Sequence, residues 1–439
     1  MYGQSPCMAV TMQSDVEKTH GGPRPLVAIA SVIVSMALVA IGNGLMFSYI
    51  PVRLGADGYA PTWAGGILTG LSAGGIAGCL LTGVLVRRIG HARAYMVLSA
   101  LIVLSNAGVA AGADPVLWIA ARALYGFGIC AMFIVAQSWL NDAVDNSIRG
   151  RVMAVFYVSY IVGMGIGSAL MGRLDIGSAQ APLIGIAFTA LSMLPVGMTR
   201  LAQPPAPEAA SVALRLAWRI SPVGITGMLA VGGLSMMIAG FAPIHATAKG
   251  FTQQEVATLM FCMPLGTVLL QIPFGWISDR TDRRYVLIAA SLLVAVAGIA
   301  AARFDAAVLT TVILVVYVVW GGASESIYSL ASAHANDRAS KDDLVALSSS
   351  MLFAWSVSGF LIPGIGTVLT AAYGTQSFIY VAVVIAVAYA LFVAWRVAQA
   401  RPVPSAETGS FAPMTAQAPL PVELGFTPEE PGTLPVPKR

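Results

Sequence analysis

The chain has 439 residues, of which 57% are hydrophobic and only 10% are charged, and its formal net charge is +4. Soluble domains carry about 25% charged residues, so this composition excludes an ordinary water-soluble protein and places most of the chain in lipid or inside a helix bundle. The weak positive charge gives no reason to expect a nucleic-acid partner.

The chain begins with a polar stretch, residues 1–24, which lacks the apolar centre of a signal peptide and is expected to form a cytoplasmic tail. A helix needs about 20 apolar residues to cross the hydrocarbon core of a membrane. Twelve segments of that kind follow, near residues 25–52, 60–86, 94–113, 115–140, 149–171, 179–198, 221–245, 253–278, 285–302, 306–333, 345–371 and 376–398. The pattern predicts an all-α membrane protein with twelve transmembrane helices.

Residues 199–220 separate the first six segments from the last six. They contain three prolines, followed by an amphipathic piece from Val212 to Arg219. This composition predicts a cytoplasmic linker with a short interfacial helix. On this division, residues 25–198 form an N-terminal six-helix half and residues 221–398 form a C-terminal one.

The two halves repeat one pattern at a fixed distance. Gly275 lies 192 residues after Gly83, and Pro243 lies 192 residues after Pro51. Two pseudo-symmetric halves of membrane-length segments are typical of secondary transporters.

The positive charges indicate the orientation of the chain. Thirteen Lys and Arg residues fall in the loops and linker of one side and four fall on the other side. Since cytoplasmic loops carry the excess of Lys and Arg, both termini are expected in the cytoplasm. Residues 399–439 are rich in Pro, Ala, Ser, Thr and Glu, and we expect a disordered cytoplasmic tail there.

No cofactor or metal site is expected from the sequence. Cys79, Cys130 and Cys262 fall in predicted spans at no metal-ligand spacing, so they are interpreted as small core residues rather than as disulfide or redox groups. The sequence has no G-x-x-x-x-G-K-[ST] loop, so ATP is not expected to drive the protein directly. It also has no H-E-x-x-H motif and no paired carboxylates within spans, which leaves a membrane-embedded enzyme or sensor as a remote alternative.

The second segment carries glycines at a spacing of four, which are Gly66, Gly70, Gly74 and Gly78. Such a stripe lies on one helix face and lets a second backbone approach closely. It predicts either static packing or a surface along which the two halves slide.

The loops after the second and eighth segments have related sequences. The first runs from Gly83 to Arg93 and includes Arg87, Arg88 and Gly90. The second runs from Gly275 through Asp279, Arg280 and Arg283 to Arg284. This second loop resembles the G-x-x-x-D-R-x-x-R-[RK] signature of the major facilitator superfamily, which occurs at the same two places in the chain.

A second motif lies in the fourth segment. Arg122, Gly126 and Gly128 are similar to the R-x-x-x-G-x-G motif of that superfamily, and the stretches Ser138–Asn141 and Ala333–Arg338 resemble its YcaD-like branch. The resemblance covers about residues 25–398, and it implies the major facilitator fold and a bacterial inner-membrane location.

The sequence departs from the superfamily pattern at two places. Arg87 stands where most members have Asp, and the fifth segment lacks the proline of the antiporter motif. The second departure weakens the case for drug efflux. Because Arg87 cannot accept hydrogen bonds from helix N–H groups, we expect gating to be asymmetric between the halves.

The resemblance implies that these loops close the cytoplasmic side. Asp279 would accept hydrogen bonds from the start of a helix in the other half. Arg280 and Arg283 are expected to pair with Asp337, and Arg88 or Arg93 with Asp142. The alternative is that these are incidental ion pairs, which contribute little at an exposed surface.

When helix ends are set aside, the ionisable residues inside the predicted spans are Arg122 and Glu325, with His245 and His334 as further candidates. Charge at that depth is costly and usually functional. Arg122 faces the central cavity by resemblance, and it would hold a substrate carboxylate or stabilise a polar network. Glu325 is the leading proton-carrier candidate, with a hydrogen-bonded structural role as its alternative. Their depths differ by about 12 residues, or roughly 18 Å, so no direct pair is expected.

The remaining cavity candidates are polar or aromatic residues of the spans, namely Asn43, Tyr125, Tyr157, Trp320 and Tyr328. Together these features predict a monomeric secondary active transporter that moves a small organic solute by alternating access. Coupling to protons is expected, and Arg122 favours an organic anion. An efflux carrier for amphipathic drug-like compounds is the alternative.

Overall fold

The structure is a computed structural model that describes residues 25–144, 146–199, 212–303, 310–340 and 343–399. The helices in these residues are α1 (Pro25–Ala56), α2 (Pro61–Ile89), α3 (His91–Ala110), α4 (Pro115–Ala143), α5 (Asn146–Met171), α6 (Gln180–Met198), α7 (Leu214–Ile220), α8 (Pro222–Ala248), α9 (Gln253–Ser278), α10 (Arg283–Arg303), α11 (Thr310–Asn336), α12 (Leu344–Tyr373) and α13 (Ser377–Gln399). The described residues contain no strand.

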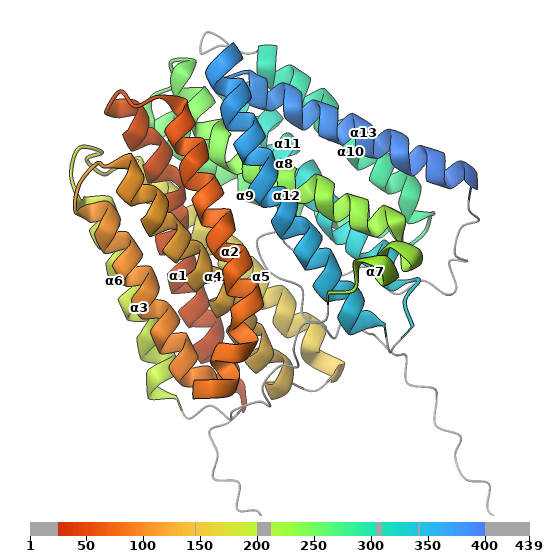
Figure 1. Cartoon of the computed structure of the whole chain (residues 1–439), viewed down its shortest axis with the longest axis horizontal. Coiled ribbons are helices and arrows are strands. Elements are labelled where there is room, and N and C mark those ends of the chain that lie inside the picture. The colour runs from red at the N-terminus through yellow and green to blue at the C-terminus, as the bar shows by residue number, and fades with distance from the viewer. Residues whose placement is uncertain (1–24, 145, 200–211, 304–309, 341–342, 400–439) are drawn as a thin grey trace, which may run out of the picture.

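Twelve of these helices, all except α7, are long and apolar enough to cross a membrane. The predicted all-α fold with twelve spans is therefore confirmed. Figure 1 shows α1 to α6 as one group and α8 to α13 as a second group beside it. The short α7 lies next to α12 and α8, where the sequence predicts an interfacial helix. Of the predicted tails, residues 1–24 and 400–439 lie outside the described residues, while residue 399 ends α13.

Local signals explain where the helices begin and end. The Asp114 side chain accepts a hydrogen bond from the backbone N–H of Val116 and so caps α4. Thr252 and Glu255 form a reciprocal capping box at the start of α9. Gly90, the single residue between α2 and α3, has φ 80°, a left-handed conformation that favours glycine.

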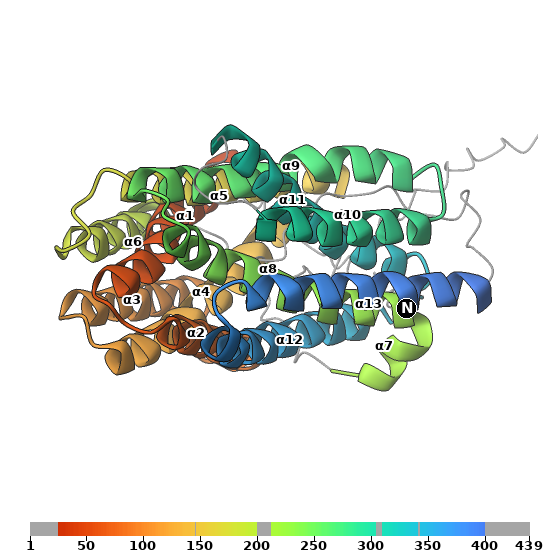
Figure 2. The same cartoon turned by 90° about the horizontal axis from the view of Figure 1, so that it is seen from above.

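The two ends of the bundle are distinguished by α7. We call the end where α7 lies, and where α2, α9 and α11 end, the linker end; α1, α5, α8 and α12 end at the opposite, far end. The halves pack together chiefly through α5 against α9 and α2 against α12, which lie side by side in Figure 2.

Two sets of hydrogen bonds join the halves. At the far end, Gln253 Nε2 at the start of α9 donates to the carbonyl oxygens of Met171 and Leu174, both at 2.8 Å. Nearer mid-membrane, Ser72 Oγ donates to the carbonyl oxygen of Gly359 at 2.8 Å. Among the described residues, these hydrogen bonds between the halves therefore lie at the far end and near mid-membrane.

The glycine stripe of α2 faces α4 within the same half. A Cβ added at Gly74 would lie 1.8 Å from the carbonyl oxygen of Ala123, and one at Gly78 would lie 2.7 Å from that of Phe127. The stripe is therefore a packing surface inside the N-terminal half, because it brings the backbones of α2 and α4 together. Of the two roles that the sequence allows, the structure favours static packing.

This packing predicts that adding one methyl group lowers stability at some glycines of α2 and not at others. The Gly74→Ala variant is expected to lose about 1–3 kcal/mol of stability, the usual cost of overpacking, because the methyl group would meet backbone. The melting temperature in detergent measures this loss. Gly75→Ala is the matched control, since the nearest atom to its added Cβ is 3.9 Å away. Equal losses in the two variants would contradict the assignment.

Candidate functional site

A cavity of about 100 Å³ lies between the two halves. Its wall comes from α1, α2, α4 and α5 on one side and from α8 and α12 on the other, and most of it is apolar. Its polar side chains are Asn43, Ser72, Tyr125, Tyr160, Trp355 and Ser356. A small organic molecule would thus meet a largely apolar surface with a few orienting polar groups, as in most ligand sites.

A second cavity of about 70 Å³ adjoins the first, and Phe47 lines both. Glu325 of α11 lies in its wall, and Ser235 Oγ of α8 donates a hydrogen bond of 2.6 Å to Glu325 Oε1. Ser235 lies 192 residues after Asn43. The repeat therefore places equivalent positions of the two halves in the two cavities.

Arg122 lies directly behind the wall of the first cavity. Its side chain is 2% exposed, and its guanidinium carbon is 4.1 Å from the centre of the Tyr125 ring. Among the residues that the structure describes, Arg122 Nη1 and the Tyr125 hydroxyl have no hydrogen-bond partner, and no carboxylate pairs with Arg122. A cation–π contact alone replaces only part of the lost hydration of a buried cation.

Asn43 extends this polar wall. Its Nδ2 donates to the hydroxyl of Tyr160 at 2.8 Å, while its Oδ1 has no partner among the described residues. The Tyr160 ring packs edge-on against Phe133, with the ring centres 4.6 Å apart. In and behind the wall of the first cavity, Arg122, Tyr125 and Asn43 thus each have a buried polar atom without a hydrogen-bond partner among the described residues.

Three of the predicted aromatic candidates do not line either cavity. Tyr157 is buried and accepts a hydrogen bond from Gln137 at 3.3 Å, and Tyr328 is fully buried. Trp320 packs inside the C-terminal half against Tyr317 and Phe378 and lines neither of the two cavities. The reason is helix geometry, since Gly321, which does line the second cavity, lies about 100° further around α11.

Sequence reasoning missed Ser235 and Phe47. Ser235 could have been found, because the 192-residue repeat relates it to Asn43. Phe47 gives no such indication, since a lone phenylalanine in an apolar span is indistinguishable from a packing residue.

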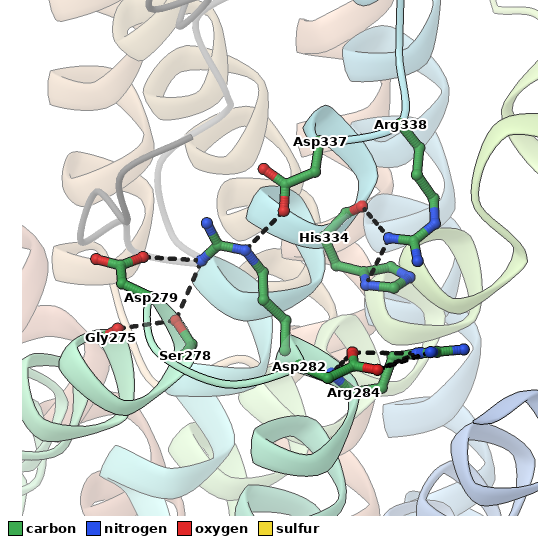
Figure 3. A network of polar contacts seen from close by, with 9 residues as sticks. Gly275, Ser278, Asp279, Asp282, Arg284, His334, Asp337 and Arg338 are labelled. Atoms are coloured by element: carbon green, nitrogen blue, oxygen red, sulfur yellow. Dashed lines mark hydrogen bonds and ion pairs between the residues drawn. The ribbon is translucent and has the colours of Figure 1, made fainter. Parts of the chain in front are cut away.

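A cluster of charged residues lies at the linker end of the C-terminal half (Figure 3). Arg283 is 3% exposed, and its Nε donates to Asp337 Oδ2 at 2.7 Å. Its Nη1 also reaches Ser278 Oγ at 3.1 Å and Asp279 Oδ1 at 3.3 Å. The predicted pairing of Arg283 with Asp337 is present, and it ties the start of α10 to the end of α11.

A second ion pair lies beside the first. Arg284 Nη2 donates to Asp282 Oδ2 at 2.6 Å, and Arg338 Nη1 lies 3.0 Å from His334 Nδ1. Burial raises the pKa of the Asp282 carboxyl, but the hydrogen bonds and charge of Arg284 outweigh burial and hold that pKa below its usual value. Burial and the charge of Arg284 lower the pKa of Arg338. Within the cluster, Asp282 and Asp337 each therefore pair with an arginine.

Other predicted loop contacts differ from expectation. Arg280 does not pair with Asp337; its guanidinium lies 3.9 Å from the centre of the Trp276 ring and donates to the Trp276 carbonyl oxygen. The turn after α9 points Arg280 back along its own helix, while Arg283 begins α10 and faces α11.

The arginines in the corresponding loop of the N-terminal half are exposed. Arg87, Arg88 and Arg93 lie at its surface, and Gly83 lies half-buried in α2. The side chain of Asp142, their expected partner, lies outside the described residues. Gly275 remains within α9, where its carbonyl oxygen accepts from Ser278 Oγ.

Comparison with known proteins agrees with these features. The model of the Major Facilitator Superfamily matches residues 32–223 and 223–428. A relative from Escherichia fergusonii, the uncharacterized MFS-type transporter YcaD, is 24% identical over 353 residues, which cover 80% of this chain and 90% of the relative. The resemblance to the YcaD-like branch is therefore confirmed.

Solved structures show the same fold. A bacterial homologue of the human lysosomal transporter Spinster, in an inward-facing and unoccupied conformation, has a TM-score of 0.70 at 13% identity, covering 87% of this chain and 99% of that one. The human organic anion transporter MFSD10 has a TM-score of 0.60 at 14% identity, covering 84% and 100%. Because the family model spans both six-helix halves, the chain belongs to the major facilitator superfamily.

Proposed function

We propose that this chain is a secondary active transporter that moves a small organic anion across the membrane, coupled to protons, by alternating access to its cavities. The chain works as a monomer in a bacterial inner membrane, with both termini in the cytoplasm. Arg122 carries the proposal, because it is a buried cation behind the cavity wall with unused hydrogen-bonding capacity among the described residues.

The physical argument concerns charge compensation. A buried arginine without a carboxylate is costly in a membrane protein. A substrate carboxylate would accept two parallel hydrogen bonds from the planar guanidinium, the geometry in which arginine binds anions most strongly. Tyr125 and Asn43, both in the cavity wall, would orient the remainder of the substrate. That MFSD10 is an organic anion transporter shows only that this fold is compatible with such cargo.

Glu325 supplies the proton-binding group in this proposal. It lies in the wall of the second cavity and accepts a hydrogen bond from Ser235. One proton neutralises its charge, which lowers the cost of moving the empty or loaded carrier through its occluded state. Because Phe47 lines both cavities, a substrate in the first cavity would alter the surroundings of Glu325.

The transported class is tested with purified protein in liposomes. Counterflow is measured for succinate and gluconate as anions, xylose and uridine as neutral solutes, and ethidium as a cation. Exchange of an anion supports the proposal. Exchange of ethidium alone would favour the alternative, an efflux carrier for amphipathic compounds, which the apolar lining by Phe133, Met236 and Trp355 would suit.

If Glu325 carries the proton, Glu325→Gln should affect counterflow and gradient-driven accumulation differently. The variant is expected to retain counterflow, since the site for the anion is intact, but to lose accumulation driven by an imposed pH gradient. Glu255→Gln is the matched control, because Glu255 caps α9 and lines neither cavity. Gradient-driven accumulation by Glu325→Gln at the wild-type level would exclude Glu325 as the proton-binding group.

A further inference from the structure

Two cysteines whose sequence context indicates small core residues lie together in the structure. Cys79 of α2 and Cys130 of α4 are 51 residues apart in the chain, and their Sγ atoms are 2.7 Å apart. Neither sits at a spacing in the sequence that would indicate a pair. The contact arises only from the packing of α2 on α4.

The packing that holds the two thiols together is built into both helices. Gly78, the neighbour of Cys79, brings the backbone of α2 against α4, where an added Cβ would lie 3.3 Å from Cys130 Cβ. Gly126 of α4 likewise lets the two backbones approach closely, since its added Cβ would lie 1.9 Å from the carbonyl oxygen of Leu71. Because a disulfide has an S–S bond of about 2.05 Å, the two Sγ atoms need to move by less than about 1 Å to bond.

The pair is also accessible to small molecules. Cys130 lines the first cavity together with Gly126 and Ile129, and neither cysteine residue is fully buried. A reagent that enters the cavity therefore meets the Cys130 sulfur, and Cys79 lies behind it as a second thiol. In a reducing compartment such a pair stays reduced, and a disulfide there is transient.

We propose that Cys79 and Cys130 form a redox-active thiol pair on the cavity wall, which an organic disulfide converts into an intramolecular disulfide. The Cys130 thiolate attacks the reagent, forms a mixed disulfide and releases one thiol. The Cys79 thiolate then attacks the Cys130 sulfur and releases the second thiol. The two cysteines together lose two protons and two electrons, and the reagent takes up both to become two thiols.

The disulfide would act on the same wall as Tyr125. Cys130 lies eight residues after Arg122 on α4, about 12 Å along the helix axis. Covalent attachment of α4 to α2 at this point would fix the wall of the first cavity. The consequence for anion movement, a reduced rate that dithiothreitol restores, rests on the proposed transport function; formation of the disulfide does not.

The experiment uses the full chain with Cys7→Ser and Cys262→Ser, so that the pair alone remains, and 4,4′-dipyridyl disulfide as the reagent. The expected result is release of two equivalents of thiopyridone per chain. Intact mass should fall by two hydrogen atoms with no adduct, and maleimide-polyethylene glycol should label no thiol after denaturation until dithiothreitol is added. The chain should stay monomeric on a non-reducing gel.

Matched variants make the result decisive. In the same background, Cys79→Ser and Cys130→Ser should each release one equivalent and retain one pyridyl adduct, because no second thiol displaces it. A chain whose only cysteine is Cys262, in α9, shows whether the reagent reaches a thiol within the micelle. Three results would overturn the proposal. The first is two stable pyridyl adducts on the pair, and the second is a disulfide between chains. The third is a pair whose two thiols stay free under conditions in which the chain with only Cys262 reacts.

Discussion

Replacing Arg122 by alanine is expected to weaken binding of an organic anion by roughly ten- to a hundredfold while the protein still folds. Hydrogen bonds to a charged group contribute about 1.5–3 kcal/mol, and about 1.4 kcal/mol corresponds to tenfold in Kd. Folding is expected to survive, because the guanidinium has no ion-pair partner among the described residues that the substitution would leave unpaired.

A thermal-shift titration of the detergent-purified protein measures this effect. A ligand that binds only the folded state raises apparent stability by RT ln(1 + [L]/Kd). An anion that raises the melting temperature of the wild type should therefore have little effect on Arg122→Ala at the same concentration. Arg122→Lys should give an intermediate shift, because lysine keeps the charge but lacks the planar fork.

Arg303→Ala controls for loss of an arginine in general, since Arg303 lies exposed at the far end of α10. An equal ligand-induced shift in wild type and Arg122→Ala would make Arg122 a structural residue. The binding of anions would then have to be assigned to other groups of the cavity.

The sequence predicts the fold well because membrane spans depend on one local property. A run of about 20 apolar residues can do little else than cross the membrane as a helix, and all twelve predicted spans are present. The pair between Arg283 and Asp337 was also predictable, because superfamily motifs place these residues at the feet of neighbouring helices.

The sequence predicts the site less completely, because cavity walls depend on helix rotation and on contacts between helices. Arg122 and Tyr125 are three residues apart, so their contact follows from helix geometry. Two hydrogen bonds at the cavities join different helices, namely Ser235 to Glu325 and Asn43 to Tyr160. The hydropathy of the sequence carries no information on such contacts. For the same reason Trp320 could not be assigned to the core rather than to the cavity.

The buried pair at the linker end predicts the largest loss of stability. Asp337→Asn is expected to destabilise the protein by about 3–5 kcal/mol, the usual cost of removing one partner of a buried ion pair. Both side chains are almost fully buried, at 3% and 6% exposure, so solvent cannot take the place of the lost carboxylate at Arg283. Unfolding in detergent mixtures, followed by circular dichroism, measures the change.

Two further variants separate burial from charge. Asp279→Asn also removes a carboxylate from Arg283, but the Asp279 side chain is 35% exposed and its contact is longer, at 3.3 Å. We expect this control to lose at most about 1 kcal/mol, as exposed pairs do. The double variant Arg283→Gln and Asp337→Asn should recover part of the loss of Asp337→Asn, because it removes the buried positive charge together with its buried carboxylate partner. If Asp279→Asn cost as much as Asp337→Asn, the stabilising contact of Arg283 would lie at the surface of the linker end, and α11 would not be held to α10 by this pair.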